Sequence, residues 1–115
     1  MIRVAVVGSR DFANLDLVRM VVDRLGEGDG VIIISGDARG VDRTAQEEAA
    51  SIGLVVEVYP AEWAIHGKSA GYVRNVDMVK RADKVIAFWD GQSKGTRFSI
   101  EQALKQQKRL EVFFA

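Results

Sequence analysis

Residues 34–46 read ISGDARGVDRTAQ and follow directly on the apolar run 31–33. A strand that leads into a helix needs one glycine at the turn and one residue that caps the helix. This stretch instead brings two glycines, a serine, an aspartate and an arginine together within residues 35–40. Glycine allows the backbone to approach another group closely. The stretch therefore predicts a strand–loop–helix unit whose backbone amides lie close to a ligand.

Apolar runs alternate with helical patterns on both sides of this unit. The runs at 2–7, 31–34, 54–59, 85–89 and 110–114 predict five strands. Helical spacing predicts inward faces made of Val18, Val21, Val22 and Leu25, of Val41, Ala45, Ala49 and Ile52, of Val73, Val76, Val79 and Ala82, and of Ile100, Ala103 and Leu104. Residues 61–70 are expected to form a loop. The alternation predicts an α/β fold over residues 1–115, a single three-layer Rossmann-like domain with a five-stranded, mostly parallel sheet of order 3-2-1-4-5.

The amino-acid composition argues against several classes of protein and against a metal site. The 115 residues contain 16 basic and 16 acidic residues, no cysteine and one histidine. Zero net charge disfavours a general nucleic-acid coat or a membrane-surface protein. The absence of cysteine excludes disulfides and thiolate metal ligands, and we expect no metal site. The first apolar run is too short for a signal peptide or a membrane span, so the expected location is the cytoplasm.

Three polar loops are expected to meet at one edge of the sheet. They read GSRDF (8–12), SGDARG (35–40) and DGQSKGT (90–96), and each follows a strand. In the order 3-2-1-4-5 the chain reverses between strands 1 and 4, and the crevice at their carboxyl ends is the usual ligand site. Unpaired amides at helix N-termini, hydroxyl groups and cations favour phosphate. The alternative for each single loop is that its glycines and polar residues only form turns and caps.

Four stretches in this order and spacing, GSRDF, ISGDARGVDRTAQ, EWAIHGKSAGYVRNVDMV and ADKVIAFWDGQSKGT, resemble the small single-domain SLOG proteins. These form the YspA-like branch of the superfamily that unites DNA-processing protein A with the cytokinin-activating LOG enzymes. SGDARGVD is similar to the S-G-x-A-R-G-[IV]-D stretch of DNA-processing protein A, and GQSKGT resembles the G-G-x-G-T phosphate loop of LOG enzymes. The resemblance covers almost the whole chain and implies a nucleotide-binding Rossmann-like fold.

The loops and the resemblance together give one set of candidate phosphate- and ligand-binding residues. These are Gly8, Ser9, Arg10, Ser35, Gly36, Arg39, Gly40, Arg74, Asn75, Asp90, Gly91, Ser93, Lys94, Gly95 and Thr96. Arg39 is expected either to pair with phosphate or to brace its loop through Asp42, which otherwise caps the following helix. The expected ligand is a nucleotide or a phosphorylated nucleotide derivative, bound by a sensor or carrier, and no particular cofactor is assigned.

Two other functions stay open. LOG enzymes cleave the N-glycosidic bond of nucleotides, and the resemblance implies an arginine, matched by Arg74, and a glutamate three residues after the G-T pair. Ser99 stands at that position here, and Glu101 is rotated away by about 200° on a helix. Asp11, Asp37 and Asp90 are the carboxylates that could substitute, so catalysis stays undecided. DNA binding, as in DNA-processing protein A, would use Lys94, Arg97, Lys105, Lys108 and Arg109, which equally suit a solvated helix face.

Aromatic residues suggest how a base and a partner would be held. Trp89, at the end of the fourth strand, stacks on a base or belongs to the core, and Trp63 and His66 lie in a loop that could cover the site. SLOG relatives commonly self-associate, so the resemblance implies a homodimer. Tyr72 and Met78 are expected outside the core face of their helix and mark the candidate interface.

Overall fold

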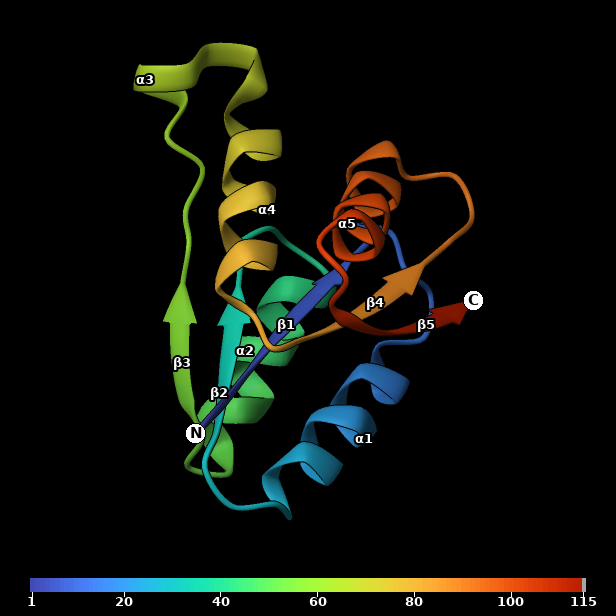
Figure 1. Cartoon of the computed structure of the whole chain (residues 1–115). Coiled ribbons are helices and arrows are strands. Elements are labelled where there is room, and N and C mark those ends of the chain that lie inside the picture. The colour runs from blue at the N-terminus through green and yellow to red at the C-terminus, as the bar shows by residue number, and fades with distance from the viewer. Residues whose placement is uncertain (115) are drawn as a thin grey trace.

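Five strands form one sheet of order β3-β2-β1-β4-β5, and every pair of neighbours is parallel (Figure 1). The computed structural model describes residues 1–114. Its strands are β1 (Ile2–Gly8), β2 (Val31–Ser35), β3 (Val55–Val58), β4 (Lys84–Trp89) and β5 (Arg109–Phe114). Its helices are α1 (Leu15–Gly26), α2 (Val41–Ser51), α3 (Trp63–His66), the 3₁₀ turn η1 (Gly67–Ser69), α4 (Ala70–Arg81) and α5 (Lys94–Lys105). The Rossmann-like topology predicted from the sequence is confirmed.

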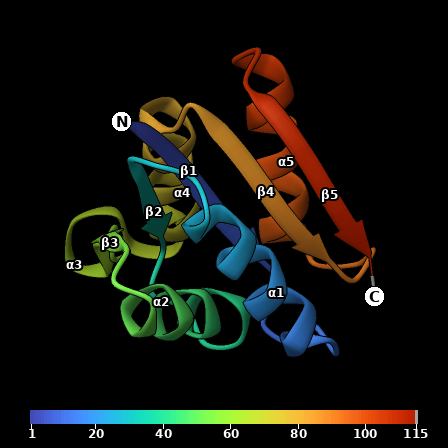
Figure 2. The same cartoon turned by 90° about the horizontal axis from the view of Figure 1, so that it is seen from below.

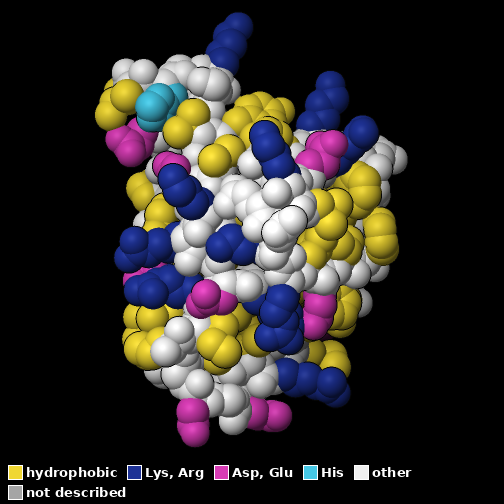
Figure 3. Space-filling view, viewed as in Figure 1, with side chains coloured by type: hydrophobic (Ala, Val, Ile, Leu, Met, Phe, Trp, Pro, Cys, Tyr) yellow, Lys and Arg dark blue, Asp and Glu magenta, His cyan; other side chains and the backbone are white. Residues whose placement is uncertain are grey.

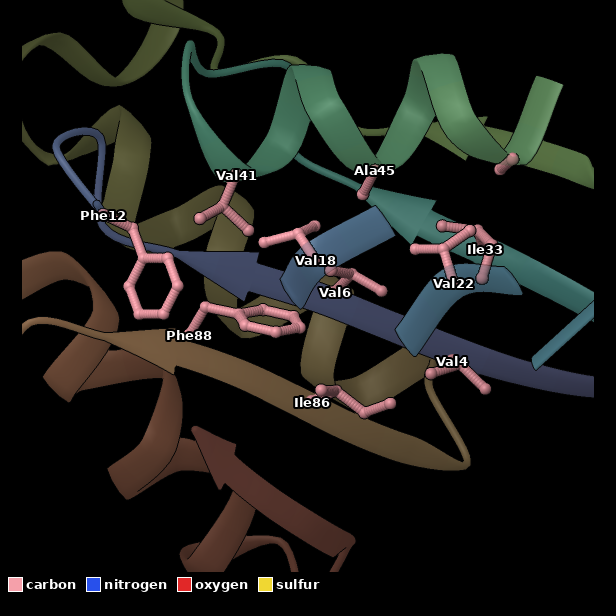
Figure 4. Packing of buried hydrophobic residues seen from close by; sticks show 11 residues of the cluster. Val4, Val6, Phe12, Val18, Val22, Ile33, Val41, Ala45, Ile86 and Phe88 are labelled. Atoms are coloured by element: carbon pink, nitrogen blue, oxygen red, sulfur yellow. The ribbon is translucent and has the colours of Figure 1, made fainter. Parts of the chain in front are cut away.

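Helices cover both faces of the sheet and make two cores. Figure 2 shows α1 and α2 on one face and α4 and α5 on the other. Alternate residues of β1 serve the two sides, since Val6 packs with α1 and α2 whereas Ala5 packs with α4 and α5. Phe12 and Phe88 meet edge to face with ring centroids 5.6 Å apart (Figure 4). Phe12 thereby anchors the loop after β1 in the core.

The segment expected as the loop 61–70 is partly helical. Trp63–His66 form one helical turn, Gly67–Ser69 form the 3₁₀ turn, and α4 begins at Ala70. No side chain of α3 or η1 is buried. A segment this short carries no hydrophobic period, and its lack of buried residues leaves no sequence signal for a helix.

Three residues lie in other environments than expected. Met78 is only 1% exposed and belongs to the α4–α5 core, so it is not a surface residue of an interface. Leu104 is 64% exposed, and Ile52 lies just beyond the end of α2 and is 42% exposed. The helix stripes are therefore rotated or shortened relative to the pattern, because the buried face depends on where each helix contacts the sheet. No helix within residues 1–114 has the length and apolar character needed to cross a membrane.

Candidate functional site

A cavity of about 500 Å³ opens at the carboxyl ends of β1 and β4, where the strand order reverses. Its walls come from the end of β1, from the loops after β1, β2 and β4, and from facing sides of α4 and α5. In Figure 1 the arrowheads of β1 to β4 point toward this end of the molecule. The cavity thus lies at the switch point of the sheet, where the sequence predicts the ligand.

The loops after β1 and β4 are joined through one buried serine. The Ser9 amide donates to the Phe88 carbonyl at 3.0 Å, and the Asp90 amide donates to Ser9 Oγ at 3.2 Å. Asp90 Oδ1 accepts hydrogen bonds from the amides of Ser93 and Gln92 at 2.8 and 2.9 Å. These backbone donors hold the pKa of Asp90 below its usual value. Asp90 is therefore an ionised turn residue, and its carboxylate shapes the approach to α5.

The start of α5 offers donors to the cavity. Ser93 caps the helix, because its Oγ accepts the Thr96 amide at 3.4 Å. Thr96 Oγ1 also lies 3.2 Å from Ser93 Oγ and 3.4 Å from Ser9 Oγ. Three hydroxyl protons are available for these two contacts, so one O–H can still donate to a ligand. Together with the amides of the first helical turn, this favours an anion at this wall.

Gly95 keeps that wall open. It lines the cavity, and a Cβ built on its backbone would have no neighbouring atom within 4 Å. Its backbone has no positive φ that would demand glycine. The absence of a side chain at Gly95 therefore keeps space free in the cavity, and the backbone conformation does not require it.

The glycines of the loop after β2 serve packing. A Cβ on Gly40, which has φ +79°, would lie 2.3 Å from the Arg10 carbonyl oxygen. A Cβ on Gly36 would lie 2.7 Å from Arg74 Nη1. These two glycines allow close contact between protein segments, and the expectation that their amides face a phosphate stays a prediction.

Arg74 on α4 is held from three sides. Its Nε donates to Asn75 Oδ1 at 2.8 Å, and its Nη1 donates to the carbonyls of Gly36 and Tyr59. Burial lowers the pKa of its guanidinium, which nevertheless stays charged in proteins. Arg74 also lines the cavity, so a fixed positive charge faces the ligand space.

Asp42, at the start of α2, is a buried carboxyl group in the cavity wall. The residue is 6% exposed, and Oδ2 accepts the Ala38 amide at 3.0 Å. Burial raises the pKa of Asp42 to about 6. The expected pair of Arg39 with Asp42 is absent among residues 1–114, where Arg43 instead pairs with Asp37 at 2.9 Å. Asp42 braces its own loop and keeps a carboxylate oxygen for the cavity.

The structure brings eight of the fifteen predicted site residues together around the cavity. Those that line the cavity are Gly8, Arg10, Arg74, Asn75, Asp90, Ser93, Gly95 and Thr96. Ser9, Ser35, Gly36 and Gly40 lie behind the wall or in the loop packing, with Ser35 Oγ bonded to the Asp42 carbonyl and to Gln46. Arg39, Gly91 and Lys94 are exposed outside the lining.

Other lining residues were not predicted as site residues. They include Asp42, Lys68, Tyr72 and Ser99. Tyr72 packs edge to face on Phe98 with centroids 4.8 Å apart, and Trp63 also faces the cavity. Trp89 does not line it, because its indole donates to the Ser93 carbonyl and packs against Phe114. The aromatic surface for a base is thus Tyr72 with Trp63, whose position depends on the unforeseen helical turn.

A parallel sheet of this order, with a polar cavity at its switch point, defines a Rossmann-like fold with a candidate ligand site. The sequence matches the YspA, cpYpsA-related SLOG family over residues 2–66. It is also 35% identical over 111 residues to the Gene 61 protein of Mycobacterium phage D29, covering 90% of this chain and 89% of that protein. The chain belongs to the YspA, cpYpsA-related SLOG family.

Solved structures share the fold. DNA processing protein A from Streptococcus pneumoniae superposes with a TM-score of 0.83 at 19% identity, over 97% of this chain and 50% of that one. The Helicobacter pylori protein of the same name, described with a single-stranded DNA binding mode, gives 0.76 at 25% identity, over 96% and 64%. TM1055 gives 0.78 at 20% identity, over 96% and 72%. This chain thus spans half of the pneumococcal protein and less than two thirds of the Helicobacter one.

Proposed function

We propose that the protein binds a phosphorylated nucleotide or nucleotide derivative in the cavity between α4 and α5, as a sensor or carrier. The observation that carries the proposal is the open wall at Gly95, where the first turn of α5 and the hydroxyls of Ser93 and Thr96 face free space. Unpaired amides and hydroxyl groups at a helix N-terminus favour the binding of phosphate. Arg10 and Arg74 supply positive charge, and Tyr72 with Trp63 supplies aromatic surface for a base.

Gly95→Val tests the phosphate wall. We expect the variant to bind AMP at least about tenfold more weakly, because the new side chain fills space needed by the phosphate. Its free energy of unfolding should be unchanged or slightly higher, because valine has a better helix propensity than glycine. Calorimetry and thermal shift with mono-, di- and cyclic nucleotides, ADP-ribose and NAD measure both properties.

A pair of arginine variants controls this experiment. Arg10→Ala removes a cation from the cavity wall, whereas Arg39→Ala removes an exposed cation outside it. Only the first should weaken nucleotide binding. Equal losses for both, or full affinity of Gly95→Val, would contradict the assignment of the site.

We expect the protein not to release free base from AMP. Ser99 lines the cavity where LOG enzymes have a glutamate, and its hydroxyl bonds to the Gly95 carbonyl at 3.3 Å. Glu101 lies outside the lining, 3.9 Å from Arg97, with its side chain 61% exposed. Chromatography of nucleotide incubations measures base release. Turnover by the natural sequence that disappears in Asp11→Asn or Asp42→Asn would identify an enzyme instead.

Single-stranded DNA is the second candidate ligand, and the charge distribution favours it. α4 carries Arg74, Lys80 and Arg81 against Asp77, whereas α2 carries Asp42, Glu47 and Glu48 against Arg43. Figure 3 looks onto the α4–α5 face, and Lys and Arg side chains are spread over it. Basic residues thus outnumber acidic ones on α4, although the net charge of the whole chain is zero. A labelled oligonucleotide titrated at several salt concentrations tests this candidate, since phosphate contacts make affinity fall steeply with salt.

Homodimerisation stays a prediction, and one of the two residues suggested for its interface no longer supports it. Met78 is buried within the protomer, and Tyr72 remains as the exposed aromatic residue of the suggested α4 interface. Light scattering at high micromolar concentration tests self-association.

A further inference from the structure

Asp42 is a buried carboxylate that forms no ion pair in the described part of the chain, although the positive charges of Arg74 and Arg10 act on it from a greater distance. No Lys or Arg nitrogen within residues 1–114 lies within ion-pair distance of it, and its one side-chain hydrogen bond is the Ala38 amide on Oδ2. No side-chain oxygen in this part of the chain is both fully buried and unsatisfied, so Oδ1 keeps contact with the cavity. A carboxylate taken out of water is costly unless it accepts further hydrogen bonds. Oδ1 is therefore free to accept a hydrogen bond from a ligand in the cavity.

The position of Asp42 indicates which part of a nucleotide brings that donor. Asp42 follows β2, and the phosphate wall at Gly95 follows β4. β1 lies between these strands, so they are about 10 Å apart in the sheet. That is the reach of a sugar phosphate and more than a phosphate alone can span. The exposed aromatic residues Tyr72 and Trp63 lie on the outer wall, which leaves the buried wall to the sugar.

We propose that Asp42 accepts hydrogen bonds from the 2′ or 3′ hydroxyl of the ligand's ribose, so that the site selects ribonucleotides over deoxyribonucleotides. The proposal rests on nucleotide binding in this cavity. A ribose hydroxyl supplies the missing donor, whereas a deoxy sugar leaves the buried carboxylate unpaired. A site built around a substrate hydroxyl rejects analogues that lack it, because the polar group in the protein then stays unsatisfied.

The test measures the affinities of AMP, 2′-deoxy-AMP and 3′-deoxy-AMP by calorimetry at about pH 7.5, where Asp42 is ionised. We expect one deoxy analogue to bind about 10- to 100-fold more weakly than AMP. Asp42→Asn should reduce this ratio to about threefold or less, since a neutral amide accepts a weaker hydrogen bond. The amide also keeps an acceptor for Ala38. Asp37→Asn, a change at an exposed carboxylate outside the cavity, should preserve the ratio of the natural protein.

Ribose 5-phosphate and 2-deoxyribose 5-phosphate separate the sugar proposal from the nucleotide proposal. Equal affinities for all three nucleotides, or an unchanged ratio in Asp42→Asn, would overturn the role of Asp42 while leaving nucleotide binding intact. Failure of AMP to bind, with discrimination between the two sugar phosphates, would overturn the nucleotide proposal alone. No binding of any of these probes would overturn both.

Discussion

Replacing Gly40 by alanine is expected to lower the free energy of unfolding by about 3 kcal/mol or more. Gly40 has φ +79° and ψ −122°, a conformation that side chains with a Cβ rarely adopt. Its Cβ would also lie 2.3 Å from the Arg10 carbonyl oxygen, a backbone atom that can move only if the loop after β1 moves. Strain and collision therefore act together. Urea unfolding of the purified variant measures the loss.

Gly53→Ala is the matched control. Gly53 has the same φ of +79°, but a Cβ there would have no neighbour within 4 Å. This variant should lose only about 1 kcal/mol, from backbone strain. The difference between the two variants measures the close approach of the loops after β1 and β2 together with any extra strain from the ψ of −122° at Gly40. Equal losses would mean that the loop contact contributes nothing beyond strain.

Asp42→Asn is expected to raise the free energy of unfolding by roughly 2–3 kcal/mol at neutral pH, since one pKa unit corresponds to about 1.4 kcal/mol. Burial raises the pKa of Asp42 from 3.8 to about 6 in the folded protein. Between these values the folded state binds more protons than the unfolded state. Stability contributed by this residue therefore falls as the pH rises through that window and stays low above it. Asparagine removes the buried charge and keeps an acceptor for Ala38.

The pH dependence identifies the cause. The advantage of Asp42→Asn should shrink as the pH falls from 7 toward 4, because the aspartate itself becomes neutral. Asp90→Asn should behave oppositely, since backbone donors lower the pKa of Asp90 and its charge stabilises the folded state above its unfolded pKa. Denaturant unfolding at several pH values measures both. A stability difference at Asp42 that is independent of pH would exclude a buried charge as its origin.

The strand order was predictable because β-branched runs alternate with helical stripes over the whole chain. Such a pattern leaves few topologies, and right-handed crossovers with a reversal after strand 1 lead to the observed order. The helix faces were less predictable. Met78 and Leu104 exchange their expected environments, because a period of 3.6 residues fixes a stripe but not the contact with the sheet.

The candidate site was predictable in its place and only partly in its residues. Glycine-rich loops after strands 1, 2 and 4 pointed to the edge where the cavity lies. The sequence does not distinguish a glycine that leaves space, such as Gly95, from one that permits packing, such as Gly40. Asp42 was expected to cap a helix or form an ion pair. Its burial in the cavity wall arises from the fold of the loop after β2, which local sequence does not encode.

One side of the cavity is formed by the exposed turns α3 and η1, and this side should tolerate substitutions better than the other. On the side formed by β1, β4 and α5, Ser9 Oγ contacts both the Asp90 amide and Thr96 Oγ1. Substitutions on this side are therefore expected to lower the stability of the fold. Residues 63–69 bury no side chain, although Trp63 and Lys68 face the ligand space. Substitutions in this short segment can therefore change the lining of the cavity with little effect on the stability of the fold. A few exposed residues thus set the shape and charge of one side of the cavity, independently of the sheet beneath it.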